Sequence, residues 1–156
     1  MVILENIPKE LRPLKQWVLW RQETRHGNKT KIPYQLCGLR ASTTESSHWS
    51  TLDEIINANP SGYSGVGFVF TEDDGFVGLD LDDCRDPITG EVDRWASWIV
   101  RNFGSYAEIS PSQTGIKIWC TGELPTTESG KKNSYHSGSI EMYHHSRYFT
   151  VTGHII

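Results

Sequence analysis

The sequence predicts an α+β fold, with a mostly antiparallel or mixed sheet and helices on one face. Several short segments alternate apolar and polar residues as strands do, most clearly Phe76–Asp82. Two segments, 50–58 and 93–103, combine helical spacing or capping residues with helix-ending residues. The 156 residues include six Trp and are enough for one domain with a hydrophobic core.

Eight short segments have strand-like composition or alternation, and we expect a strand at each. They are 16–20, 29–34, 65–70, 76–82, 105–110, 115–121, 139–143 and 147–152. The third and fourth are expected to form a hairpin through the turn-rich segment 71–75, and the last two a second hairpin. Segment 124–137 is polar and irregular, so we expect a mobile loop there.

The two helices are expected to begin and end at recognisable residues. In the first, Ser50 is the expected N-cap, with an acid at the third helical position as in a capping box, and Asn59 ends the helix. In the second, apolar residues recur at helical spacing from Trp95 to Phe103, and Gly104 follows as a stop.

Composition argues against secreted and membrane-spanning classes. The first eleven residues contain two acids and no long apolar run, so we expect no signal peptide. No stretch approaches the roughly 20 apolar residues of a membrane span. Cys37, Cys84 and Cys120 match no metal or redox spacing, which favours reduced thiols and a cytoplasmic location.

The net charge of −4 is unevenly distributed along the chain. Residues 1–40 hold eight Lys or Arg and three acids, residues 41–99 hold two and twelve, and residues 100–156 hold five and four. A cationic N-terminal region beside an acidic centre can attract phosphates while the acids hold metal. An ordinary solvated surface explains the same distribution.

The most informative stretch places Asp80 and Asp82 on one face of a strand whose other face is apolar. Same-face neighbours lie roughly 6–7 Å apart, which suits a pair of metal ions about 3.5–4 Å apart. Two adjacent like charges are costly unless a cation lies between them. The alternative is structural, because aspartates at strand ends often cap the next turn.

Two further charged residues are expected on the same face. Lys117 and Glu141 each lie between two apolar residues of a predicted strand. If the apolar residues of all three strands share one core, then Asp80, Asp82, Lys117 and Glu141 emerge together on the opposite face. This arrangement would be a set of three metal-binding carboxylates with a cation nearby.

The same residues belong to an ordered series of motifs. Asp80-x-Asp82, Ser110-Pro-Ser-Gln-Thr-Gly-Ile-Lys117 and Ile140-Glu141-Met-Tyr resemble the three motifs of the archaeo-eukaryotic primase superfamily. The resemblance is greatest to the primase–polymerase domains of phage and plasmid replication proteins. Further points of similarity extend it to nearly the whole chain: Trp17–Trp20, Lys31–Tyr34, Gly65–Phe68 and Arg147–Gly153.

The resemblance implies a template-directed nucleotidyltransferase, a DNA primase and DNA polymerase, that uses two-metal catalysis with Mg²⁺ or Mn²⁺. Asp80, Asp82 and Glu141 would be its catalytic residues and metal ligands. An RRM-like catalytic core would occupy 61–156, after a small α/β unit at 1–60, in one domain taken from a longer replication protein. Its partners would be nucleoside triphosphates, a single-stranded DNA template or primer, and a helicase domain or protein, with no membrane.

The resemblance also implies contacts with the incoming nucleotide. The second motif usually ends in a His that meets the nucleotide phosphates, and Lys117 stands in its place. A Lys can hold a phosphate as a point charge, but it offers no neutral imidazole nitrogen. The other expected contacts are Ser110, Ser112, the backbone of Gly115, Arg147 and Lys31. An ordinary turn and exposed strand positions also explain these residues.

Two other functions stay open at this point. The Lys at position 117 favours a catalytically impaired module that binds nucleotides or single strands. A metal-dependent nuclease is the third possibility, because two-metal carboxylate sites also cleave phosphodiesters. No residue in the sequence identifies a preference for ribonucleotides or deoxyribonucleotides.

Overall fold

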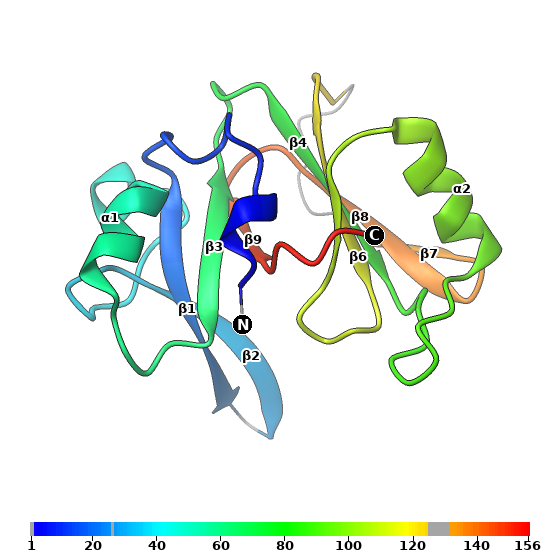
Figure 1. The fold of residues 1–156 in the computed structure, drawn as a ribbon, viewed down its shortest axis with the longest axis horizontal. Helices are drawn as coiled ribbons and strands as arrows, with labels where there is room; N and C mark the ends of the chain where they lie inside the picture. The colour runs from blue at the N-terminus through cyan, green and yellow to red at the C-terminus, as the bar shows by residue number, and fades with distance from the viewer. Residues whose placement is uncertain (1, 26, 125–131) are drawn as a thin grey trace.

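The computed structural model describes residues 2–25, 27–124 and 132–156, which form two antiparallel sheets and two α-helices (Figure 1). Sheet A has the strand order β2-β1-β3-β9, and sheet B has the order β5-β6-β4-β8-β7. The strands are β1 (Trp17–Arg25), β2 (Asn28–Tyr34), β3 (Gly65–Phe70), β4 (Phe76–Asp82), β5 (Ala107–Ile109), β6 (Ile116–Thr121), β7 (Asn133–Tyr135), β8 (Gly138–Tyr143) and β9 (Arg147–Val151). The helices are α1 (Leu52–Ala58) and α2 (Arg94–Phe103), with short 3-10 helices η1 (Leu4–Asn6) and η2 (Ser46–His48). The expected α+β class is confirmed.

The helices belong to different sheets, which corrects the expectation of one sheet with helices on one face. Helix α1 packs against β1, and α2 packs against β6. Figure 1 shows the two helices at opposite ends of the long axis, with the sheets between them. Sheet A takes two strands from before residue 61 and two from after it, so the expected division at residue 60 is not a boundary between sheets. Within the described residues, no helix is long and apolar enough to cross a membrane.

The hairpin expected at 65–82 does not form. Strand β3 pairs with β1 on one side and β9 on the other, so neither of its edges is available to β4. Strand β4 pairs instead with β6 and β8. Asp74 holds the crossing between the sheets, because its carboxylate accepts hydrogen bonds from the Gln16 side chain (2.6 Å) and from the backbone nitrogens of Thr71 (2.8 Å) and Phe76 (2.7 Å).

The second expected hairpin is also wrong, because β8 lies in sheet B and β9 in sheet A. The pairing of the segments at 105–110 and 115–121 is confirmed by β5 and β6. Strand β7 lies within the segment 124–137 that was expected to be a loop, and residues 125–131 of that segment lie outside the described residues.

Helix α1 begins one residue later than expected. Thr51 is the N-cap and forms a capping box with Glu54. Ser50 cannot take this role because its backbone pairs with Trp17, through two hydrogen bonds of 2.9 Å. Helix α2 ends at Gly104 as expected, with a φ of 56° that glycine adopts at little cost.

The core of sheet B confirms the alternation read from the sequence. The side chains of Val77, Leu79 and Leu81 of β4 are buried in one cluster with Ala96 and Ile99 of α2. Since side chains alternate along a strand, Asp80 and Asp82 project from the opposite face. That face approaches sheet A at Gly78, where an added Cβ would lie 2.6 Å from the rings of both Phe149 and Phe70. The acids therefore lie next to the contact between the two sheets.

Candidate functional site

Four charged side chains form a row across sheet B. Asp80 of β4 is directly opposite Lys117 of β6 on one side and Glu141 of β8 on the other. Lys117 is in turn opposite Glu108 of β5. Directly paired residues in antiparallel strands project from the same face. The register therefore brings together Asp80, Lys117 and Glu141, which come from three separate sequence motifs.

Lys117 and Asp80 form an ion pair that is largely shielded from water. Lys117 Nζ lies 2.6 Å from Asp80 Oδ2, and the two side chains are 7% and 16% exposed. The same ammonium group lies 4.2 Å from the centre of the Phe149 ring of sheet A, within range of a cation–π interaction. The second oxygen, Asp80 Oδ1, is buried and has no hydrogen-bond partner among the described residues. Such an oxygen carries a desolvation cost that no hydrogen bond offsets, and a bound cation would relieve it.

Lys132 lies between the other two acids. Its Nζ is 2.8 Å from Asp82 Oδ2 and 3.7 Å from Glu141 Oε1. The hydrogen bond to Asp82 raises the pKa of Lys132. The sequence predicts an irregular loop at this residue and does not predict its position beside the acids. The two adjacent lysines just before β7 were the available signal.

The carboxylates are arranged around these two ammonium groups. Within residues 2–25, 27–124 and 132–156, no three His, Cys, Asp or Glu side chains are grouped so as to hold a metal ion. Metal ligation by Asp80, Asp82 and Glu141 therefore stays a prediction. The chemistry of the donors fits it, because carboxylate oxygens are the ligands that Mg²⁺ and Mn²⁺ prefer. The unpartnered Oδ1 of Asp80 fits it as well.

Tyr143 orients Glu141, a contact that sequence analysis also missed. Its hydroxyl donates a hydrogen bond to Glu141 Oε2. The alternation of β8 was the available signal, because residues two apart share a face. Burial raises the pKa of Tyr143, so the phenol keeps the proton that it donates. Arg147 is exposed at the start of β9, and its charge partly opposes the rise in the pKa of Tyr143.

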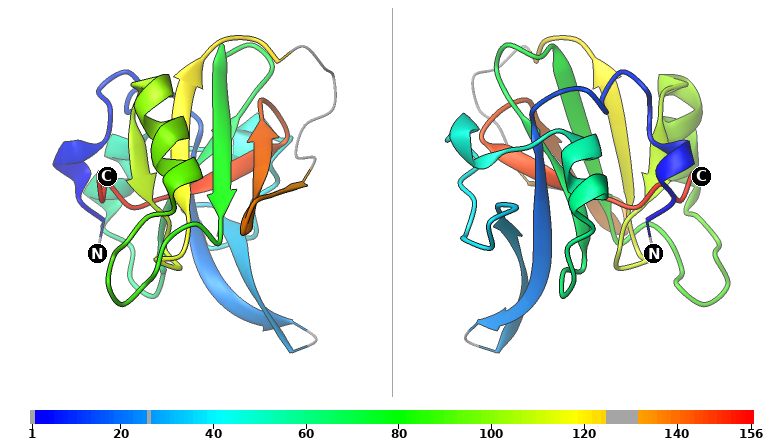
Figure 2. Two further views of the ribbon diagram at one scale, coloured as in Figure 1. Left: turned by 90° about the vertical axis from the view of Figure 1, so that its right-hand side faces the viewer. Right: turned by 60° about the vertical axis from the view of Figure 1, so that its left-hand side comes forward.

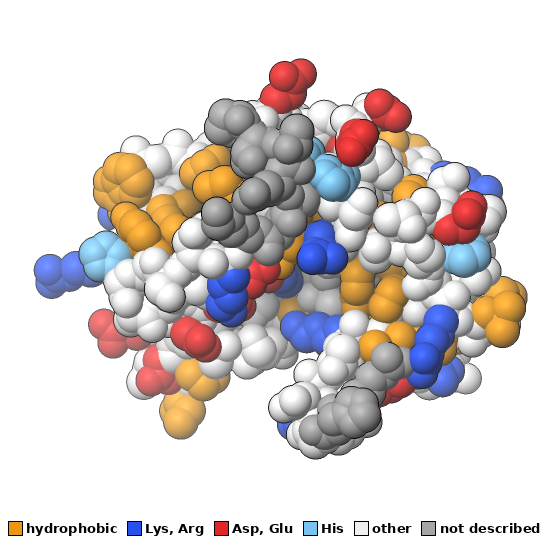
Figure 3. Space-filling model, turned by 180° about the vertical axis from the view of Figure 1, so that it is seen from behind, with side chains coloured by type: hydrophobic (Ala, Val, Ile, Leu, Met, Phe, Trp, Pro, Cys, Tyr) orange, Lys and Arg blue, Asp and Glu red, His pale blue; other side chains and the backbone are white. Residues whose placement is uncertain are grey.

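Lys31 approaches the site from sheet A. The hydroxyl of Tyr148 donates a hydrogen bond of 2.8 Å to the Lys31 carbonyl, which fixes β2 at this point. Burial and the neighbouring charge of Lys117 lower the pKa of Lys31, and Asp80 and Asp82 act in the opposite direction. Lys31 is therefore within electrostatic reach of the expected acids. Viewed from behind, basic and acidic side chains lie close together near the middle of the molecule (Figure 3).

The Ser110–Gly115 segment forms the turn between β5 and β6. Ser110 Oγ accepts a hydrogen bond of 3.2 Å from the Gly115 nitrogen and lies 2.8 Å from Ser112 Oγ. Gly115 packs closely on β4, since an added Cβ would lie 2.7 Å from the Leu81 carbonyl oxygen. These contacts show that the segment is a turn between two strands, which is the structural alternative considered from the sequence. Its expected contact with nucleotide stays a prediction.

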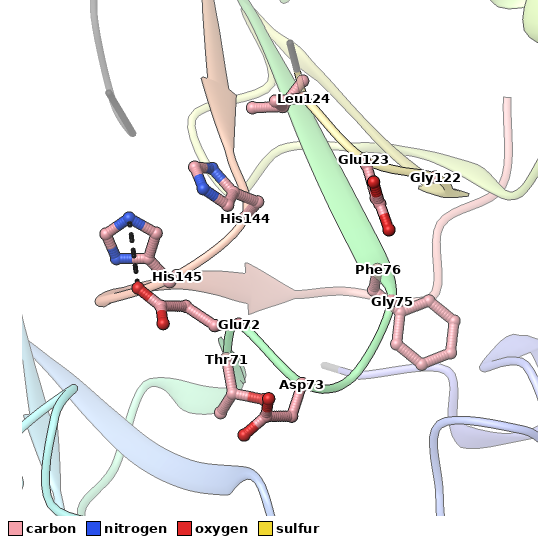
Figure 4. Close-up of a pocket in the computed structure, with 10 residues that line it drawn as sticks. All are labelled: Thr71, Glu72, Asp73, Gly75, Phe76, Gly122, Glu123, Leu124, His144 and His145. Atoms are coloured by element: carbon pink, nitrogen blue, oxygen red, sulfur yellow. Dashed lines mark ion pairs between the residues drawn. The ribbon is translucent and has the colours of Figure 1, made fainter. Parts of the chain in front are cut away.

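A cavity of about 730 Å³ lies apart from these acids (Figure 4). Its lining includes Glu72 from the β3–β4 crossing and Glu123 from the segment after β6. His144 and His145 from the β8–β9 turn also line it. His145 Nε2 faces Glu72 Oε1 at 3.9 Å. None of the acids expected from the three motifs lines this cavity. The candidate site is therefore defined by strand register and ion pairs, not by this cavity.

Comparison with known proteins gives one informative similarity. No family model matches the sequence. The chain is 36% identical over 149 residues to a protein of Nitratiruptor phage NrS-1 described as a DNA primase-polymerase. The match covers 94% of this chain but 20% of that protein, so the chain spans about a fifth of its relative's length. This similarity supports a primase–polymerase relationship for the chain.

Proposed function

We propose that this chain is the catalytic domain of a template-directed nucleotidyltransferase, a DNA primase and DNA polymerase acting in the cytoplasm. The observation that carries the proposal is the register of sheet B, which aligns Asp80, Lys117 and Glu141 in one row. The similarity to part of a phage DNA primase-polymerase supports it. The proposal includes an RRM-like core at 61–156, for which the antiparallel sheet B and its helix α2 are the supporting features.

In this proposal, Asp80, Asp82 and Glu141 hold Mg²⁺ or Mn²⁺. Bound divalent ions would supply activation of the attacking 3′-hydroxyl and neutralisation of the triphosphate charge. The protein contributes the orientation of the ligands. Tyr143 holds Glu141 through Oε2, and Lys117 holds Asp80 through Oδ2, which leaves Asp80 Oδ1 in need of a partner.

The cations around the acids are proposed to bind the nucleotide. Lys117 and Lys31 lie close enough for their charges to interact unfavourably, and an anion placed near both would relieve that repulsion. Arg147 is exposed near Tyr143 and has the fork of donors suited to phosphate. The hydroxyls of Ser110 and Ser112 and the backbone of Gly115 are the remaining proposed donors.

Calorimetry with Mn²⁺ and a non-hydrolysable nucleoside triphosphate tests this proposal. We expect the wild-type protein to bind the two ligands together, each raising the affinity for the other, because they share one site. Asp82→Asn and Glu141→Gln should each weaken joint binding by about tenfold or more, since a hydrogen-bonded or metal-bound charge is worth more than about 1.4 kcal/mol. Asp53→Asn, at an exposed position of α1, is the matched control. A wild-type protein that binds neither ligand would show the proposal to be wrong.

Lys117 favours a second candidate, a module that binds nucleotide without joining it. Its ammonium group is paired with Asp80, and a lysine offers no imidazole nitrogen at this place. Extension of a labelled primer on a single-stranded template separates the two candidates. Metal-dependent extension that is lost in Glu141→Gln supports the polymerase, whereas triphosphate binding without extension supports the module. Strand degradation without triphosphate would instead indicate a nuclease.

A further inference from the structure

The two lysines that meet the acids differ in how firmly they are held. Lys117 is 7% exposed, lies against the Phe149 ring and pairs with one acid of the adjacent strand. Lys132 is 57% exposed and is shared between two acids that come from different strands. An exposed lysine side chain can change its partner at little cost, whereas a buried ion pair is costly to separate.

The position of Lys132 is set by the charge around it. Asp82 and Glu141 are like charges that approach the same ammonium group, at 2.8 and 3.7 Å. Asp80 lies directly opposite Glu141 in the sheet and adds a third negative charge. Adjacent like charges repel one another unless a cation lies between them. Lys117 is the cation paired with Asp80, and Lys132 is the cation between Asp82 and Glu141.

We propose that Lys132 is a positioning residue that occupies the place of a divalent cation between Asp82 and Glu141, and that pairs with triphosphate once a cation has replaced it. The inference rests on the proposed function and adds to it the exchange of partners by one side chain. A divalent ion compensates two carboxylates more completely than one ammonium group, and the two cannot occupy the same place. The displaced ammonium group keeps its charge beside the site, where it meets the phosphates as a compact point charge.

The exchange predicts effects of opposite sign on two affinities. Lys132→Met keeps the length of the side chain and removes its charge. It should tighten the binding of Mn²⁺ alone by about fivefold, because the competing ion pair is gone. At saturating Mn²⁺ it should weaken the binding of a non-hydrolysable triphosphate by about fivefold, because a phosphate contact is lost. A merely structural role would not move the two affinities in opposite directions.

Electron paramagnetic resonance of unbound Mn²⁺ measures the first affinity, and calorimetry measures the second. Lys15→Met, at an exposed lysine before β1, is the matched control and should change neither. Lys132→Arg keeps the charge and should restore both affinities to near the wild-type values. If the wild-type protein binds Mn²⁺ and triphosphate but Lys132→Met alters neither affinity, or weakens both, this inference is wrong and the proposed function stands. If the wild-type protein binds neither ligand, both the inference about Lys132 and the proposed function are wrong.

Discussion

Asp80 combines a structural role with the proposed chemical one. One of its oxygens is paired with the buried ammonium group of Lys117, and the other is buried without a partner among the described residues. Removing one member of a buried ion pair leaves an uncompensated charge, which is more costly than the pair itself is stabilising. The stability of the fold is therefore sensitive to Lys117.

Lys117→Met is expected to lower the free energy of unfolding by about 3 kcal/mol, because the charge of Asp80 loses its counter-ion. Urea unfolding followed by circular dichroism measures the change. Asp80→Asn in the same chain should recover part of the loss, since the uncompensated charge is then absent. A double variant no more stable than Lys117→Met would contradict this account. Lys15→Met, the exposed control, should change stability by no more than about 0.5 kcal/mol.

At the scale of single residues, the face of the sheet on which a side chain lies can be predicted where apolar and polar residues alternate. The faces of Asp80 and Lys117 follow from the apolar residues on either side of them, which are buried on the other face. Glu141 follows the same alternation through Ile140, which packs against that core, although Met142 on its other side is 41% exposed. The partners of these acids did not follow, because an ion pair depends on which strands become neighbours. Lys132 lies in a polar segment without periodicity, so no pattern related it to Asp82.

At the scale of elements, the hairpin formed by β1 and β2 has two unlike faces. Lys29 and Lys31 are directly opposite Thr24 and Gln22, so these four share a face that carries no acid. On the other face, Glu23 pairs with Arg40 at 3.3 Å. Figure 2 shows the hairpin extending beyond the body of the molecule. The Lys29–Lys31 face therefore leads outward from the candidate site.

This face is expected to contact the backbone of a single-stranded template. Lys29→Gln should weaken the binding of an oligonucleotide and reduce the slope of log affinity against log salt by about 0.7, the value for one lost phosphate contact. Fluorescence anisotropy over a series of salt concentrations measures both quantities. Lys15→Gln removes the same charge elsewhere. An equal effect of the two variants would mean that overall charge, and not this face, governs binding.

Pairing between elements was harder to predict than their existence. The turn-rich segment 71–75 resembles a hairpin loop locally, yet β3 has β9 from the far end of the chain on its second edge. Such a pairing has no local signal in a single sequence. The start of α1 was predicted wrongly for a similar reason, because the backbone of Ser50 pairs with Trp17 of β1, which is distant in the sequence.

At the scale of the whole molecule, Glu108 joins the two sheets. This residue of β5 is completely buried. Its carboxylate accepts hydrogen bonds of 2.8 Å from the backbone nitrogens of both Thr152 and Gly153, which follow β9 of sheet A. The Tyr106 hydroxyl donates a further bond of 2.6 Å. Burial raises the pKa of Glu108, while these hydrogen bonds and the charge of Lys117 partly oppose the shift.

The raised pKa of Glu108 gives the stability of the fold a defined dependence on pH. Between the ordinary value of 4.5 and the raised value, the native chain holds a proton that the unfolded chain has released. The contribution of this proton to the free energy of unfolding is therefore complete below the ordinary pKa. It is lost as pH rises from that value to the raised pKa. Glu108→Gln has no ionisable group at this position and lacks that loss.

The free energy of unfolding of Glu108→Gln, relative to the wild-type protein, should therefore increase as pH rises through this window. Urea unfolding at a series of pH values measures the difference, with the exposed Glu10→Gln as the control. The amide is close in shape to a protonated carboxyl, so the two proteins should be most alike at the acidic end. If the free energies of unfolding of the variant and the wild type change with pH in parallel, the raised pKa of Glu108 is contradicted. Its hydrogen bonds would then join the two sheets without making stability depend on pH.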